Sequence, residues 1–267
     1  MKMSNYSPEH IKYLKNEKQK KTIKISLQIA IFVLFFTLWE LLTFFDVINP
    51  FIFSSPSRAI KMLGTLTKTG LFRHIGITLF ETVLGFLSGT VLGFIIAVLL
   101  WWSPMARAVI DPYLVILNSL PKIALGPVII VWVGAGISSV ITVTLLISIV
   151  VAIMGVLNGF NEVEQAKLTL LKTFGATKRQ LFFKVVFPAS IPTTVSVLKL
   201  NIGMSWVGVI VGEFLNSKAG LGYLIVYGGQ VFKMDIVMSA TLILCMLSAL
   251  MYFAVVLLEK TVNKKRN

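Results

Sequence analysis

Residues 123–161, IALGPVIIVWVGAGISSVITVTLLISIVVAIMGVLNGFN, decide the fold, because this stretch of 39 residues contains no charged side chain. One α-helix crosses a bilayer in roughly 20 residues, so the run is too long for a single span. Gly134 and Gly136 predict a turn near its middle. We therefore expect two membrane helices here, the first of which begins near Ile110.

Further apolar runs lie on both sides of this stretch, at residues 25–45, 82–106, 189–212 and 236–258. The chain is 56% hydrophobic and only 13% charged, with a mean hydropathy of +0.86, which excludes a soluble globular domain. The sequence predicts an all-α integral membrane protein with six transmembrane helices. One membrane domain, residues 25–258, lies between a basic N-terminal segment, 1–24, and a basic tail, 259–267.

The distribution of lysine and arginine predicts the orientation of the chain in the membrane. With both termini in the cytoplasm, the inner segments hold 17 basic residues and the outer segments hold 6. Basic loops remain in the cytoplasm, so we expect both termini there, in a multi-pass protein of the cell membrane. The net charge of +14 then reflects orientation and attraction to anionic lipid headgroups, and does not indicate nucleic-acid binding.

A basic amphipathic segment, residues 158–188, interrupts the apolar runs on the cytoplasmic side. We expect a first short helix that ends near Phe174, a turn at Gly175, and a second helix from about Thr177. Pro188 precedes the return into the membrane. This helix–glycine–helix arrangement with a basic rim predicts a compact knob that fits a groove on a partner protein.

Glycines spaced by four residues mark one face of the second span. Gly85, Gly89 and Gly93 allow another helix backbone to approach closely, either within the subunit or at a homodimer seam. In the outer loop, Ser57 followed by RAIKML predicts a capped helix along the membrane interface.

Prolines and charges inside the spans identify candidates for a translocation pathway. Pro121 and Pro127 are expected to break the third span, and broken backbone at membrane depth borders protein or a wet cavity. Intramembrane charges are costly and often functional, although snorkelling or an internal ion pair would also explain Lys122 and Lys199. The candidate pathway residues are Pro121, Lys122, Pro127, Lys199, Trp206 and Glu213.

The sequence offers little for catalysis. Its two histidines, His10 and His74, fall in different loops, and it has no G-x-x-x-x-G-K-[ST] phosphate-binding loop. We expect no enzyme activity and no cofactor or metal on this chain. An ion-coupled secondary transporter is the alternative function, and a purely structural membrane subunit is a third possibility.

Four motifs, in order along residues 50–255, resemble ABC-importer permeases of the nitrate/sulfonate/taurine branch. Residues 169–176, TLLKTFGA, with VVFP at 185–188, are similar to the EAA loop of these permeases, although Thr169-Leu170-Leu171 replaces Glu-Ala-Ala. The other three are LPKIALGP at 120–127 with Trp132, Gly134 and Gly136; Trp206 with Gly212-Glu213-Phe214; and GLGYL at 220–224.

This resemblance implies a type I importer permease that works as a homodimer with two other components. A cytoplasmic ATPase dimer would bind ATP and Mg, and an extracytoplasmic solute-binding protein would dock on the outer loops 47–75 and 214–233. The solute would be nitrate, a sulfonate, taurine or a heterocyclic vitamin precursor. The residues expected to couple to the ATPase are Thr169, Leu170, Leu171, Phe174, Gly175, Ala176, Lys178, Arg179 and Pro188.

Overall fold

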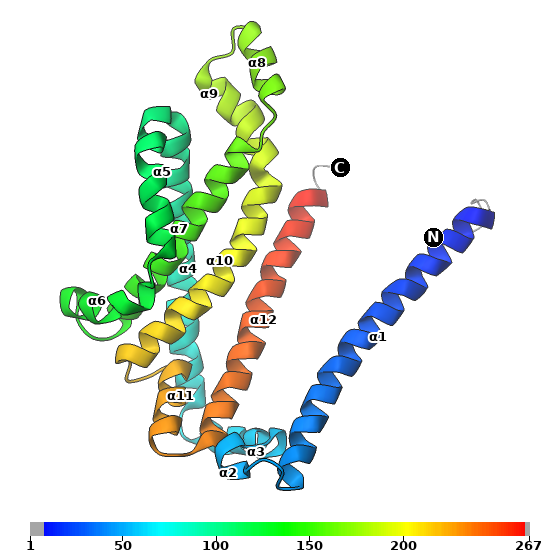
Figure 1. The fold of residues 1–267 in the computed structure, drawn as a ribbon, viewed down its shortest axis with the longest axis vertical. Helices are drawn as coiled ribbons and strands as arrows, with labels where there is room; N and C mark the ends of the chain where they lie inside the picture. Colours follow the sequence, from blue (N-terminus) through cyan, green and yellow to red (C-terminus); the bar gives the residue numbers. More distant parts are fainter. Residues whose placement is uncertain (1–7, 265–267) are drawn as a thin grey trace.

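The computed structural model describes residues 8–264, and residues 1–7 and 265–267 of the two basic tails lie outside it. The described chain is helical throughout, with short connections (Figure 1). Its α-helices are α1 Pro8–Phe44, α2 Pro50–Phe53, α3 Pro56–Lys68, α4 Leu71–Trp102, α5 Pro104–Ser119, α6 Gly126–Val133, α7 Ile137–Asn161, α8 Gln165–Thr173, α9 Lys178–Leu181, α10 Phe187–Asn216, α11 Leu221–Gln230 and α12 Met234–Lys264. A 3₁₀ segment, Lys122–Leu125, precedes α6, and a π-helical turn, Phe182–Val186, joins α9 to α10.

Five helical segments are long and apolar enough to span a membrane, and a sixth candidate is the broken pair formed by α5 with Lys122–Val133. The two halves of that pair meet at 88°. The predicted all-α membrane fold with six spans is therefore confirmed, with the third span sharply broken. The described ends of α1 and α12 lie on the same side of the molecule as α8 and α9, opposite α2 and α3 (Figure 1).

Helix α7 forms the centre of the bundle, between α4 and α10. The glycine stripe on α4 packs against small residues of α7 in the same chain, because a Cβ added at any of these glycines would overlap an α7 side chain. The facing pairs are Gly85 with Thr144, Gly89 with Ser148 and Gly93 with Ala152. Helix α10 approaches α7 at the same level, where a Cβ added to Gly208 would lie 2.6 Å from the Cα of Thr144. The α4 stripe is thus occupied within the subunit.

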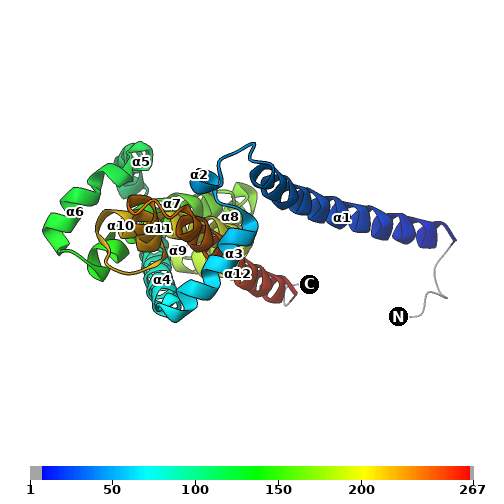
Figure 2. The same ribbon diagram turned by 90° about the horizontal axis from the view of Figure 1, so that it is seen from below.

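Helix α1 stands apart from the bundle in both views (Figures 1 and 2). None of the residues in its most apolar 18-residue window is buried. Its outer end approaches α2 and α3, where Ser57 donates two hydrogen bonds to Glu40, from its backbone nitrogen at 2.9 Å and from its hydroxyl at 2.6 Å. The long apolar surface of α1 is therefore available to lipid or to another protein.

Helix α3 connects α1 to the bundle on the side opposite α8 and α9. Its N-cap is Ser55, whose hydroxyl accepts a hydrogen bond from the backbone nitrogen of Arg58 at 3.3 Å. The prediction of a cap at Ser57 was therefore wrong by two residues. Pro56 occupies the first turn of the helix, which explains why helix formation begins before Ser57. Arg58 pairs with Asp235 at 3.0 Å and thereby attaches α3 to the start of α12.

Candidate functional site

The segment α8–α9 protrudes from one end of the bundle as the predicted helix–glycine–helix knob (Figure 1). Helix α8 ends at Thr173, and Gly175 adopts a φ of +77°, a conformation that side-chain-bearing residues rarely tolerate. Thr177 then caps α9 in a reciprocal arrangement with Gln180, in which each side chain accepts from the other residue's backbone nitrogen. Local signals in the sequence therefore determine this turn.

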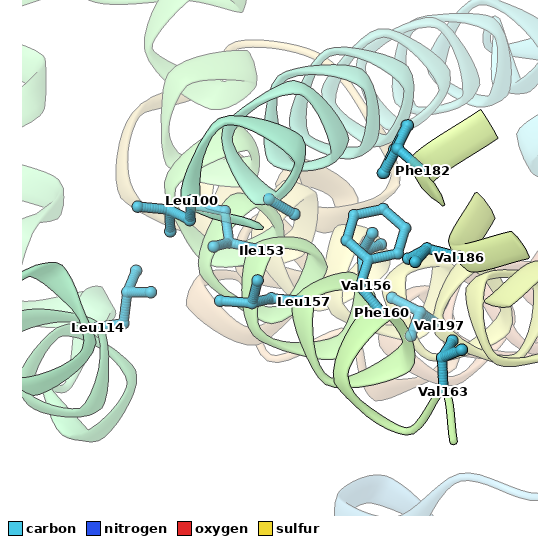
Figure 3. Packing of buried hydrophobic residues seen from close by; sticks show 11 residues of the cluster. Leu100, Leu114, Ile153, Val156, Leu157, Phe160, Val163, Phe182, Val186 and Val197 are labelled. Atoms are coloured by element: carbon cyan, nitrogen blue, oxygen red, sulfur yellow. The ribbon is translucent and has the colours of Figure 1, made fainter. Parts of the chain in front are cut away.

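An aromatic cluster anchors the base of the knob. Phe182 is 3% exposed and packs against Trp101 and Trp102 at the end of α4 and against Phe160 of α7. Figure 3 shows Phe182 beside Phe160 and Val186 in the largest buried cluster. Lys178 adds a hydrogen bond from its ammonium group to the Trp102 carbonyl at 2.6 Å. The knob is thus fixed to the membrane helices rather than loosely tethered.

The tip of the knob exposes large apolar side chains beside basic ones. Phe174 is 78% exposed and Leu170 is 57% exposed there. Nearer the base, in the π-helical turn, Phe183 is 56% exposed beside the guanidinium of Arg179. Exposed aromatic and arginine side chains are the residue types that dominate protein–protein binding energy. The structure brings the predicted coupling residues Thr169, Leu170, Leu171, Phe174, Gly175, Ala176, Lys178 and Arg179 together in this protrusion, with Pro188 in the first turn of α10.

Phe183 belongs to this exposed surface but was not among the predicted coupling residues. Its neighbour Phe182 points into the bundle, and adjacent positions on a helix face different directions. The presence of two consecutive phenylalanines in a water-exposed loop was the available signal.

The broken third span contains three of the predicted pathway residues. Helix α5 ends at Ser119, the chain turns at Pro121, and Pro127 occupies the first turn of α6. Lys122 is partly exposed, and its ammonium group donates to the Asn118 carbonyl at 3.1 Å. Broken helices of this kind expose backbone groups that can line a wet cavity.

The three predicted pathway residues of α10 lie in different surroundings. Lys199 pairs with Glu259 of α12 at 2.8 Å, with side-chain exposures of 22% and 24%. Trp206 is 6% exposed within a cluster that includes Val255. The structure therefore does not gather the six predicted pathway residues into one surface, and Lys199 has the internal ion pair that was its alternative explanation.

Glu213 is 1% exposed and links three elements at the outer end of α10. Its carboxylate accepts from the Thr78 hydroxyl of α4 at 2.6 Å and from the backbone nitrogen of Gly222 in α11. Glu81 of α4 is also fully buried, and within the described chain neither of its carboxyl oxygens has a hydrogen-bond partner. Glu213 is thus a buried connection among α4, α10 and α11.

A family model described as the inner membrane component of binding-protein-dependent transport systems matches residues 89–264. A "Probable ABC transporter permease protein" of Haemophilus influenzae is 33% identical over 82% of this chain and 89% of its own length. The formylaminopyrimidine transport permease protein ThiX of Halalkalibacterium halodurans is 29% identical over 72% of this chain and 76% of its own. The taurine transport system permease protein TauC of Escherichia coli is 21% identical, with 85% of each chain covered.

The fold is similar to that of a solved chain from the MetNI methionine ABC transporter in an inward-facing conformation. The TM-score is 0.65, the identity is 22%, and the match covers 72% of this chain and 95% of the other. At this level of identity the likeness concerns the arrangement of helices alone. The overall arrangement of helices is thus a known architecture.

Proposed function

Because this chain belongs to the family of inner membrane components of binding-protein-dependent transport systems and is a permease subunit of an ABC importer, we propose that it couples solute uptake to a separate ATPase through α8–α9. The partner would be a cytoplasmic dimer that binds ATP and Mg, and this chain itself would carry no cofactor. The observation that carries the proposal is the exposed apolar and basic tip of a knob that is rigidly anchored to the bundle.

The anchoring explains how the knob would transmit force. Helical residues continue without a break from Lys178 to Asn216, so a displacement of α9 moves the base of α10 directly. The aromatic cluster at Phe182 also connects the knob to α4 and α7. Closure of the ATPase dimer would therefore tilt these helices and open the pathway toward the outer side.

The outer elements and α1 support the remaining partners. The segments around α3 and α11 would receive an extracytoplasmic solute-binding protein, and a second copy of this permease would complete the pathway between two bundles. The exposed apolar length of α1 supports a position against lipid or the second copy. The named relatives transport formylaminopyrimidine and taurine, so we propose a small polar solute of the sulfonate, nitrate or vitamin-precursor class, taken up across the cell membrane.

The first experiment is to tag the chain, solubilise its native membrane gently, and identify the proteins that copurify in stoichiometric amount. We expect an ATPase with a phosphate-binding loop, and ATP-dependent uptake after the components are reconstituted in vesicles. Recovery of the chain alone, from membranes in which other ABC complexes stay intact, would refute ATPase coupling and favour ion-coupled transport.

A further inference from the structure

A cavity of about 370 Å³ lies on the side of the bundle opposite the knob, among α3, α11 and the first turns of α4 and α12. Apolar side chains, including Leu66 and Ile236, form its inner wall. Its polar residues are His74, Tyr223, Tyr227 and Lys233, with Thr65 and Thr69. A cavity with an apolar wall and a few convergent polar groups is the usual form of a binding site.

Three stacked aromatic rings make one wall of this cavity rigid. The rings of His74 and Tyr223 are 5.9 Å apart and nearly parallel, and Tyr227 continues the stack at 6.0 Å from Tyr223. The Gly220 nitrogen donates to His74 Nδ1 at 3.0 Å and fixes the first ring. The wall therefore exists before any partner binds, which lowers the entropic cost of association.

Lys233 supplies the charge at this cavity. It sits in the turn between α11 and α12, where its backbone nitrogen donates to the Gly228 carbonyl at 2.8 Å, and its side chain is exposed. Within the part of the chain that the structure describes, no carboxylate lies within ion-pair distance of Lys233. A lysine without an acidic partner, in a cavity that tyrosine and threonine residues also line, is suited to a carboxylate group.

The surrounding surface also has more positive than negative charge. Asp235 is the single acidic residue on α3, α11 and the start of α12, and it is already paired with Arg58. Several basic side chains on the same side of the bundle have no acidic partner in the described chain, namely Lys61, Lys68, Arg73 and Lys218. This surface is complementary to an acidic partner, and such complementarity steers association and fixes orientation.

We propose that this cavity receives an acidic side chain of the solute-binding protein, with Lys233 as its ionic partner and the Tyr223–Tyr227 stack as its wall. The inference rests on the proposed function and specifies how its extracytoplasmic partner docks. The cavity lies between the two outer segments expected to contact that protein, and 370 Å³ is at the small end of binding cavities, which suits one inserted side chain better than a folded loop.

The test uses the complete transporter in lipid nanodiscs together with the solute-binding protein identified by copurification. ATPase activity is measured as that protein is titrated, which gives its half-saturating concentration. We expect Lys233→Glu to raise this concentration roughly tenfold or more, since a carboxylate would then face an acidic side chain. Lys61→Glu is the matched control, because it makes the same charge change on α3 outside the cavity lining and reports the general effect of surface charge.

A second measurement locates the partner residue. Carbodiimide treatment of the assembled complex joins a lysine amine to a carboxylate in contact with it, and peptide mass spectrometry should find Lys233 linked to an aspartate or glutamate of the binding protein. Replacing that acid with lysine should restore the affinity of the Lys233→Glu transporter.

Equal half-saturating concentrations for Lys233→Glu and Lys61→Glu would overturn the inference, as would failure of the charge swap to restore affinity. In either case the wild-type complex would still show stimulation by the binding protein, so the proposed function would stand. Absence of that stimulation in the wild type would instead refute the proposed function itself.

Discussion

Replacement of Phe174 with alanine should weaken binding of the ATPase while leaving the permease folded. The ring lies just before the turn at Gly175 and is 78% exposed, so its removal takes little packing away from the chain itself. An aromatic side chain buries about 150–250 Å² when fully enclosed. Because Phe174 as a whole residue is 78% exposed, about 120–200 Å² remains for a partner to cover.

The magnitude follows from this area. At about 25 cal/mol per Å², covering the ring contributes about 3–5 kcal/mol to the free energy of binding, as an upper value. Because association also immobilises the ring, we expect Phe174→Ala to cost about 2–3 kcal/mol, the size of an interface hot spot. This corresponds to a rise in the dissociation constant of roughly 30- to 150-fold.

The assay is a titration of purified ATPase onto the permease in nanodiscs, with thermal unfolding of the permease alone as the test of folding. Phe72→Ala is the matched control, since the substitution removes the same ring. Phe72 is 73% exposed and lies at the end of α4 that is remote from the knob. A dissociation constant for Phe174→Ala equal to that of Phe72→Ala would refute the assignment of the knob as the ATPase contact.

Three further substitutions test other parts of the structure. Gly175→Val should lower uptake per ATP hydrolysed in reconstituted vesicles, because a φ of +77° costs a β-branched residue about 1–3 kcal/mol. Gly175→Asn should have a milder effect, since asparagine tolerates this conformation better. Equal coupling of uptake to ATP hydrolysis in both variants would contradict a role for the turn. Gly208→Val should lower the midpoint of thermal unfolding, at a cost of about 1–3 kcal/mol from overpacking, whereas Gly203→Val on the same helix points into open space and should change it little. Lys199→Met should destabilise the protein by leaving Glu259 unpaired, and the double variant Lys199→Met/Glu259→Met should recover that stability. If uptake stays impaired in the double variant after stability has recovered, Lys199 also acts in transport.

The sequence predicted the knob in detail because its signals are local. A glycine at the turn, a threonine cap and a glutamine three residues later specify the conformation without help from distant residues. The same holds for the membrane spans, since a helix in lipid needs only length and apolar composition. The break at Pro121 was predictable in position, but its 88° angle was not, because a missing backbone donor permits a bend without fixing its size.

Contacts between distant segments could not be predicted. The spacing of Gly85, Gly89 and Gly93 indicates that some helix approaches α4, but identifying α7 requires the three-dimensional arrangement. The sequence predicted Glu213 as an intramembrane charge but not its contacts. Thr78 lies far from it along the chain, and Gly222 lies across a turn. Its burial at 1% exposure makes it a structural connection in this conformation, and a direct contact with solute stays a prediction.

These buried contacts connect the two ends of the molecule. The uninterrupted helical stretch from Lys178 to Asn216 contains 39 residues, and at about 1.5 Å per residue it extends for roughly 58 Å from the knob to the outer side. At its outer end Glu213 holds the first turn of α11 through Gly222, and α11 carries Tyr223 and Tyr227 of the cavity wall. A tilt imposed at α9 therefore reaches the proposed docking cavity through one helix and one buried carboxylate. Glu213→Gln keeps the shape of the side chain but weakens this connection, so it should raise the half-saturating concentration of the binding protein. An unchanged half-saturating concentration would show that Glu213 does not hold the docking cavity in place.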